Sequence, residues 1–287
     1  MIAVYKRELR AFFLNPTGYV FLGLFLLITG IFFGFGNIMG RSSDFPNLVG
    51  SVQFIFLLGV PILTMRLFAE EMRQKTDQLL LTSPVTIPAI VAGKYLAALT
   101  VFLIAVAVTA LYAVTIAIWG DLALAQSIGA MVGFMLAGAS YLAIGLLVST
   151  ATENQAIAAV GTFAILLLLQ LVEPLRSGMP REQFAGMAFA ALAILIAAYA
   201  LFAATRSVFV GIAALVVLGC AAALFGLLDP LFFQGLIAES LGLLSIVSRQ
   251  QRFTAGILAL DDIVYHLTFI FVFLFLCVRF IEKRRWS

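Results

Sequence analysis

The chain has 287 residues, of which 63% are hydrophobic and only 11% are charged. Soluble domains are about 45–50% apolar and about 25% charged, so a soluble fold of this length could not cover so much apolar surface. The net charge of +3 is small, and no basic run is interleaved with aromatic residues, which argues against a nucleic-acid partner. Both cysteines, Cys220 and Cys277, fall inside apolar runs and are expected to be packing residues.

The first fifteen residues predict a short amphipathic helix at the membrane surface. Apolar side chains recur at helical spacing from Ile2 to Phe13. Asn15-Pro16 should end this interfacial helix (residues 1–15) and begin the first span. Two interpretations stay open, a simple membrane anchor or a mechanical link to the segment that follows the second span. The basic residues expected near anionic headgroups are Lys6, Arg7 and Arg10.

Eight apolar stretches are each long enough for a transmembrane helix, which needs about 20 mostly apolar residues. The runs are continuous rather than alternating, which predicts helices and not barrel strands. The fold class is therefore an all-α integral membrane protein, and residues 1–287 are expected to form one transmembrane domain. The predicted spans cover about 17–39, 50–68, 95–119, 127–149, 155–175, 184–204, 207–228 and 262–281.

The distribution of basic residues predicts the orientation of the chain. With eight spans both termini lie on one side, and twelve of the 17 lysines and arginines then fall on that side and five on the other. Because the richer side is expected to be cytoplasmic, the sequence predicts a multi-pass protein of the cell membrane with both termini in the cytoplasm. Residues 229–261 then form the longest loop on the opposite side. Its repeated apolar residues predict short, re-entrant helices that dip partway into the membrane.

The motifs of several enzyme classes are missing from the sequence. No Walker A motif exists, because Gly93-Lys94 lacks the preceding glycine and is followed by Tyr95. No Cys/His cluster has metal-ligand spacing, and the single histidine, His266, cannot form a site alone. No Gly-x-Ser-x-Gly sequence is present. We therefore expect no catalytic activity, no metal and no cofactor in this chain.

Ionisable residues are missing from the middle of every predicted span. Such residues are costly at membrane depth and usually mark ion or proton pathways. Glu173 and Asp262 lie near outer ends of spans, and Arg66 and Arg279 lie near inner ends, where their side chains can reach water. This pattern argues against an ion-coupled carrier, so the energy for any transport should enter from another protein.

The segment 69–94 is the polar part of the chain between spans two and three. Phe68, Met72, Leu79 and Leu80 can share one helical face, and the helix should end before Pro84. Thr86 can cap a second helix that leads into the third span. A helix–elbow–helix joined to two spans suits force transmission from a cytoplasmic partner, whereas the alternative is a solvated loop. The predicted contact residues are Glu70, Glu71, Arg73, Lys75, Thr76 and Asp77, with Pro84 as the elbow.

Four stretches of the chain resemble the permease subunits of ABC-2-type exporters, of the gliding-motility type. They are Glu8–Phe13 with Pro16–Val20, Pro61–Glu71, Thr76–Val85 with Gly93-Lys94, and Asp262–Tyr265 with Glu282–Trp286. The resemblance covers about residues 1–175 and 229–287. Two features depart from the family pattern. Lys75 stands where the family often has glycine before the coupling threonine, and the pair of spans in 184–228 is additional to the usual six.

The resemblance implies a transport function for the chain. It implies a dimer, formed with a second copy or a sister permease, and cytoplasmic ABC ATPase subunits that bind ATP and Mg²⁺. Segment 69–94 would then be the cytoplasmic coupling helix that receives the ATPase motion. An alternative from another class is a non-transporting membrane scaffold that recruits or regulates a cytoplasmic ATPase. The residues do not indicate which substrate is transported.

Overall fold

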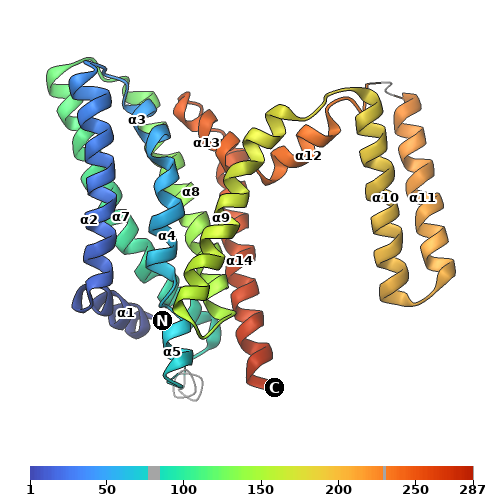
Figure 1. Cartoon of the computed structure of the whole chain (residues 1–287), viewed down its shortest axis with the longest axis horizontal. Coiled ribbons are helices and arrows are strands. Elements are labelled where there is room, and N and C mark those ends of the chain that lie inside the picture. Colours follow the sequence, from blue (N-terminus) through green and yellow to red (C-terminus); the bar gives the residue numbers. More distant parts are fainter. Residues whose placement is uncertain (77–84, 229–230, 287) are drawn as a thin grey trace. The chain divides into compact units, whose positions relative to one another are not determined.

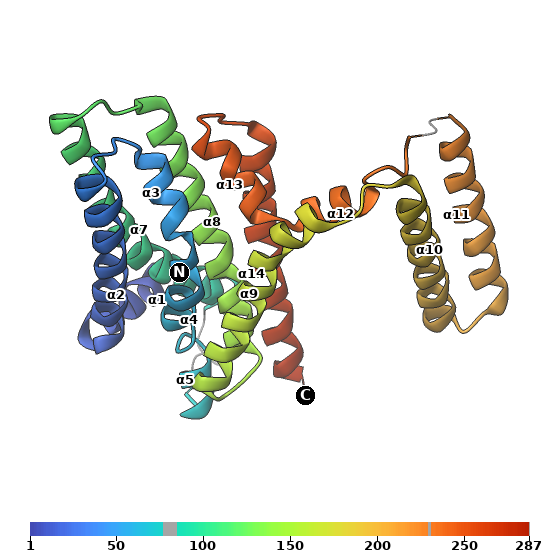
Figure 2. The same ribbon diagram turned by 45° about the horizontal axis from the view of Figure 1, so that its top comes forward.

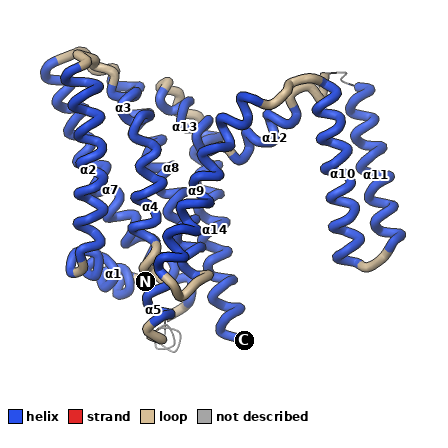
Figure 3. The backbone as a smooth tube through the Cα atoms, viewed as in Figure 1, coloured by secondary structure: helices blue, strands red, loops and turns tan. Residues whose placement is uncertain are grey.

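The structure of the protein is a computed structural model, which describes residues 1–76, 85–228 and 231–286. Every element of regular structure in these residues is a helix (Figure 3). Eight helices are long and apolar enough to cross a membrane, in agreement with the eight predicted spans. They are Pro16–Met39, Phe45–Arg73, Ile87–Trp119, Leu124–Thr150, Gln155–Gly178, Gln183–Thr205, Val208–Leu228 and Leu260–Arg284. The prediction of an all-α membrane protein is confirmed.

The chain folds as two compact units. Unit 1 comprises Met1–Leu168 and Ile246–Ser287, and unit 2 comprises Leu169–Ser245. Unit 1 contains helices from both ends of the chain, and its two termini lie at the same end of its helices (Figure 1). The predicted additional pair of spans lies within unit 2.

Unit 1 begins with α1 (Ile2–Leu14), which lies crosswise to α2 (Pro16–Phe32) in Figure 1. The break between them follows from the sequence, because Asn15 has extended backbone (φ −92°, ψ 156°) and Pro16 opens α2. The Asn15 side chain makes no capping hydrogen bond. α2 continues into a π-helical segment, η1 (Phe33–Met39).

The second span of unit 1 is assembled from several short helices. They are α3 (Phe45–Ser51), η2 (Val52–Ile55), α4 (Phe56–Thr64) and α5 (Ala69–Arg73). Asp44 caps α3 by accepting a hydrogen bond of 3.0 Å from the Asn47 amide. Residues 65–68 form the turn between α4 and α5. This turn carries the chain out of the span and into the predicted coupling segment.

The long helices of unit 1 run side by side (Figure 2). They are α7 (Ile87–Trp119), α8 (Leu124–Thr150) and α14 (Leu260–Trp286), with the short α13 (Ile246–Thr254) beside them. α9 (Gln155–Gly178) follows α8 after a short turn. α8 is the central helix, and 72% of its most apolar 18 residues are buried. Its Phe134 and Tyr141 pack on Phe56 of α4, with ring centroids 4.6 and 5.3 Å apart. Such aromatic pairs contribute about 0.5–1.5 kcal/mol each beyond the area they bury.

Unit 2 contains the end of α9 with α10 (Gln183–Thr205), α11 (Val208–Leu228) and α12 (Leu236–Leu244). α10 and α11 are joined by a tight connection at Arg206, whose backbone is left-handed (φ 52°). Only 6% of the most apolar 18 residues of α10, and 0% of those of α11, are buried. Because both helices are apolar on all sides, these surfaces suit lipid. The predicted re-entrant loop, residues 229–261, contains α12 and α13, which have nine residues each.

Candidate functional site

Four charged side chains meet where α1, α5 and α7 come together, at the end of unit 1 that holds the termini (Figure 1). The Lys94 ammonium on α7 lies 3.0 Å from Glu8 of α1 and 2.9 Å from Glu71 of α5. Arg7 of α1 lies 2.6 Å from Glu8 and 2.5 Å from Glu71. We call Arg7, Glu8, Glu71 and Lys94 the four-charge cluster. Its two positive and two negative charges compensate each other.

Lys94 is the buried centre of the four-charge cluster. Its side chain is 0% exposed, whereas those of Glu8 and Glu71 are 12% and 17% exposed. The ammonium also donates a hydrogen bond of 2.6 Å to the Leu67 carbonyl, in the turn that precedes α5. A buried charge is tolerated only when it is paired and hydrogen-bonded, and Lys94 meets both conditions. Lys94 therefore joins α7 to both α1 and the end of the second span.

The residue before Lys94 explains how α1 can come so close to α7. A Cβ atom on Gly93 would lie 3.1 Å from side-chain atoms of Val4 and 3.2 Å from the Met1 carbonyl oxygen. Glycine therefore permits the close approach of the two helices at this point. Tyr5 adds a second connection, since its hydroxyl lies 3.1 Å from the hydroxyl of Thr100 on α7.

Arg7 closes the cluster on its solvent side, where its side chain is 52% exposed. Partial burial acts to lower the pKa of Arg7, but the hydrogen bonds and charges of Glu8 and Glu71 outweigh burial and raise that pKa. Arg7 therefore stays charged at every physiological pH.

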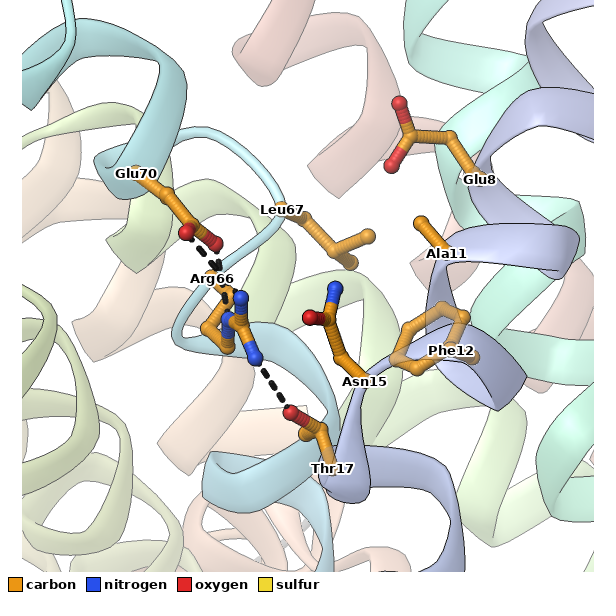
Figure 4. A pocket seen from close by; sticks show the side chains of 8 residues that line it. All are labelled: Glu8, Ala11, Phe12, Asn15, Thr17, Arg66, Leu67 and Glu70. Atoms are coloured by element: carbon orange, nitrogen blue, oxygen red, sulfur yellow. Dashed lines mark hydrogen bonds and ion pairs between the residues drawn. The ribbon is translucent and has the colours of Figure 1, made fainter.

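A second ion pair fixes α5 to the start of α2 (Figure 4). Arg66 donates two hydrogen bonds to Glu70, of 2.7 and 3.0 Å, and a third of 2.6 Å to the Thr17 hydroxyl. This two-bond geometry is the stronger form of an arginine–carboxylate pair. The same residues, with Glu8, Asn15 and Leu67, line a small pocket between the α1–α2 and α4–α5 connections. The turn of the second span is thus tied to the first span.

Ser149, near the end of α8, holds the same turn from the other side. Its buried hydroxyl oxygen accepts hydrogen bonds from the Phe68 and Ala69 amides, at 3.1 and 3.2 Å. These amides open α5 and have no partner within a preceding helical turn. At the end of α14, Arg284 contacts Met72 and donates a hydrogen bond of 2.9 Å to Glu153, after α8. α5 is therefore connected to α1, α2, α7, α8 and α14.

The predicted site residues fall into two groups in the structure. Glu70 and Glu71 are half-buried and are paired within unit 1, whereas Arg73, Lys75 and Thr76 are exposed. Lys6 and Arg10 are exposed on α1. Asp77 and Pro84 lie outside the described residues. Thr86 does occupy the position before α7, although its side chain makes no capping hydrogen bond.

Sequence reasoning missed the roles of Glu8 and Lys94. A signal was present in each case, because Lys94 is the one charge in an otherwise apolar helix and Glu8 is the one acid in a basic helix. Their pairing spans 86 positions of the chain, so no local pattern could reveal it. Among the described residues, no group of three or more His, Cys, Asp or Glu could hold a metal ion.

Lys75 follows α5 with a left-handed backbone, at φ 56°. This region costs an L-residue roughly 1–2 kcal/mol, and glycine adopts it freely. The conformation therefore gives a physical reason for the glycine that the resembling family often has here. We expect Lys75→Gly to stabilise the purified protein in detergent by up to about 1 kcal/mol, measured from its thermal unfolding.

A matched glycine substitution one position earlier controls for the greater freedom of glycine in the unfolded chain. Gln74 has a right-handed backbone (φ −85°), so Gln74→Gly is expected to destabilise the protein by about 0.5–1 kcal/mol. Equal destabilisation by the two substitutions would show that the left-handed conformation at Lys75 carries no strain.

Residues 41–172 match the family model described as ABC-2 family transporter protein. This match supports an ABC-2-type permease. The matched region runs from the start of the second span into α9, and it contains Glu71 and Lys94 but not α1. No curated protein matches the chain. With its eight apolar helices, the chain is a multi-pass membrane protein.

Proposed function

We propose that the permease is the membrane-spanning subunit of an ABC exporter, and that it couples ATP hydrolysis by separate ATPase subunits to movement of a substrate. The resemblance of its first and last stretches to gliding-motility-type permeases supports that subgroup. In this proposal the permease works as a dimer in the cell membrane, with both termini in the cytoplasm. ATP and Mg²⁺ are bound by the ATPase subunits and not by this chain.

The observation that carries the proposal is the burial of Lys94 between Glu8 and Glu71. An ordinary solvated loop would not need a buried charge to hold it against three helices. Because α5 is tied to α2 through Arg66 and to α8 through Ser149, a force on α5 reaches four helices of unit 1 through short, paired contacts. This arrangement suits a segment that transmits force to the spans better than a loop that only joins them.

The free energy for transport would come from the partner. Two states of the ATPase pair differ in their affinity for ATP, so ATP binding shifts the equilibrium between them. This shift changes the conformation of the permease only if the two proteins are mechanically connected. We propose that Arg73, Lys75 and Thr76, which are exposed, face the ATPase. Glu70 and Glu71 would then act indirectly, by holding α5 to the bundle. Asp77 and Pro84 stay part of the proposed contact segment.

Charge reversal of Arg73 tests the contact without breaking the cluster. Arg73→Glu is expected to weaken binding of the ABC ATPase that copurifies from native membranes by about tenfold, because an interfacial cation is replaced by an anion. The matched control is Arg181→Glu, since Arg181 is an exposed arginine in unit 2 between α9 and α10. Binding is measured by titrating the ATPase onto permease in nanodiscs.

Two outcomes would contradict the proposal. Equal ATPase affinity for the Arg73 and Arg181 variants would remove the contact assignment. Normal ATPase binding, without ATP-dependent uptake into inside-out vesicles of any small molecule found bound to the purified complex, would favour the scaffold alternative.

A further inference from the structure

A second polar cluster lies at the end of unit 1 opposite the termini, where α13 packs against α8 and its side chains reach the start of α14 (Figure 1). It is separate from the four-charge cluster and plays no part in the proposed coupling to the ATPase. We call it the α13 polar cluster. Its members are Ser140 of α8, Arg249 and Gln250 of α13, and Asp262, Tyr265 and His266 of α14.

Ion pairs hold α13 to the start of α14. Asp262 is 0% exposed and lies 2.9 Å from Arg249, and it also contacts Arg252. Arg252 in turn lies 2.9 Å from Asp261. The Arg249 guanidinium stacks 3.8 Å from the centre of the Tyr265 ring. Within the cluster Arg249 and Asp262 compensate each other, as the neighbouring Arg252 and Asp261 do, so the cluster carries no net charge when His266 is neutral.

One ring nitrogen of His266 is buried without a hydrogen-bond partner among the described residues. Its Nδ1 lies 2.9 Å from the Ser140 hydroxyl, which also lies 2.9 Å from the Leu136 carbonyl oxygen. When Ser140 donates its one proton to Leu136, Nδ1–H must donate to Ser140 and Nε2 is a bare acceptor. In the opposite tautomer Nε2–H is a donor. Either way Nε2, which is buried, has no hydrogen-bond partner among the described residues.

Neighbouring buried atoms also lack hydrogen-bond partners among the described residues. Six buried atoms of the cluster make no hydrogen bond within the described part of the chain. An unmet polar atom that is buried away from water costs free energy comparable with a lost hydrogen bond. A small molecule that supplies the missing bonds would remove this cost. The atoms are Arg249 Nε, Gln250 Nε2 and Oε1, Asp262 Oδ2, Tyr265 OH and His266 Nε2.

The unmet atoms define the chemistry of the missing partner. Arg249 Nε and Gln250 Nε2 need an acceptor, whereas Gln250 Oε1 and Asp262 Oδ2 need a donor. The two arginines would repel a cation, and the two aspartates would repel an anion. The partner must therefore be neutral, small and able both to donate and to accept. We propose that the α13 polar cluster is a buried hydration site, in which water molecules bridge α13 to α8 and α14.

His266 makes the proposal testable, because it is the chain's one histidine. In membrane-embedded permease labelled with ¹⁵N-histidine, magnetisation transfer from water to the His266 ring is measured by solid-state NMR. The matched control is Cys277, labelled with ¹³C in a Cys220→Ser variant, since Cys277 is also 0% exposed and lies on α14. We expect transfer to His266 to build up at least threefold faster than transfer to Cys277. Equal build-up would overturn the proposal.

A substitution gives an independent check that needs no NMR signal. Gln250→Met keeps the length of the side chain and removes both unmet amide atoms. If the site holds no water, this change removes the free-energy cost of the two unmet amide atoms and raises the melting temperature. If water satisfies the amide, the melting temperature is expected to stay the same or fall. A rise would contradict the proposal, and neither experiment depends on an ATPase or a substrate.

Discussion

Lys94→Met is expected to destabilise the protein by about 3–5 kcal/mol, because it leaves the half-buried Glu8 and Glu71 with Arg7 alone to compensate their two charges. Folded domains are stable by only about 5–15 kcal/mol, so such a loss would lower the amount of folded protein sharply. The hydrogen bond to the Leu67 carbonyl is lost as well. The measurement is the denaturant or thermal unfolding of purified protein in detergent, together with its expression in the membrane.

Lys6→Met is the matched control for this substitution. Lys6 is exposed on α1, two residues from Glu8, and the change in chemistry is identical. The control is expected to alter stability by less than about 0.5 kcal/mol. Should the Lys94 variant be as stable as the Lys6 variant, the four-charge cluster would not hold α1, α5 and α7 together. Restoring stability in Lys94→Met by a further Glu71→Gln substitution would support the charge argument directly.

Gly145→Val is expected to destabilise the contact between α4 and α8 by about 1–3 kcal/mol. A Cβ atom on Gly145 would lie 2.9 Å from the Thr64 Cγ2 and 3.0 Å from the Thr64 Cβ. The Thr64 side chain is buried and already bonded to the Val60 carbonyl oxygen, at 2.9 Å, so it cannot turn away without a loss. The helices must then move apart next to the turn at residues 65–68. Unfolding of the purified protein measures the effect.

Gly23→Val provides the comparison for the Gly145 substitution. Gly23 lies on α2, and no atom lies within 4 Å of a Cβ added there. The same change is therefore expected to be close to neutral at Gly23. A large loss in both variants would mean that valine disfavours these helices by itself, and that the close approach of α4 and α8 is not the cause.

The sequence was sufficient for the membrane-spanning helices, because each is a long apolar run and the breaks have local causes. Asn15-Pro16 ends α1 and opens α2. Residues 151–154 form so short a connection that α8 and α9 must be antiparallel. These features depend on neighbours in the chain, which sequence reasoning handles well.

The charged contacts could not be predicted, because they depend on which helices pack together. Glu70 and Glu71 were expected on an exposed contact surface, yet the structure pairs them with Arg66 and Lys94. Ser140 and His266 are 126 positions apart and meet only because α8 packs on α14. The left-handed backbone of Lys75 was not predicted either, because a lysine side chain gives no sign of it.

Cross-linking of α5 to the ATPase tests the coupling proposal most directly. Arg73→Cys, in a variant that lacks Cys220 and Cys277, is reconstituted with the copurifying ABC ATPase and treated with a short bifunctional maleimide reagent. The account predicts a permease–ATPase product that forms through the introduced thiol and changes in yield when ATP is added. Modification of that thiol from the outer face of sealed cells, with no ATPase product, would contradict it.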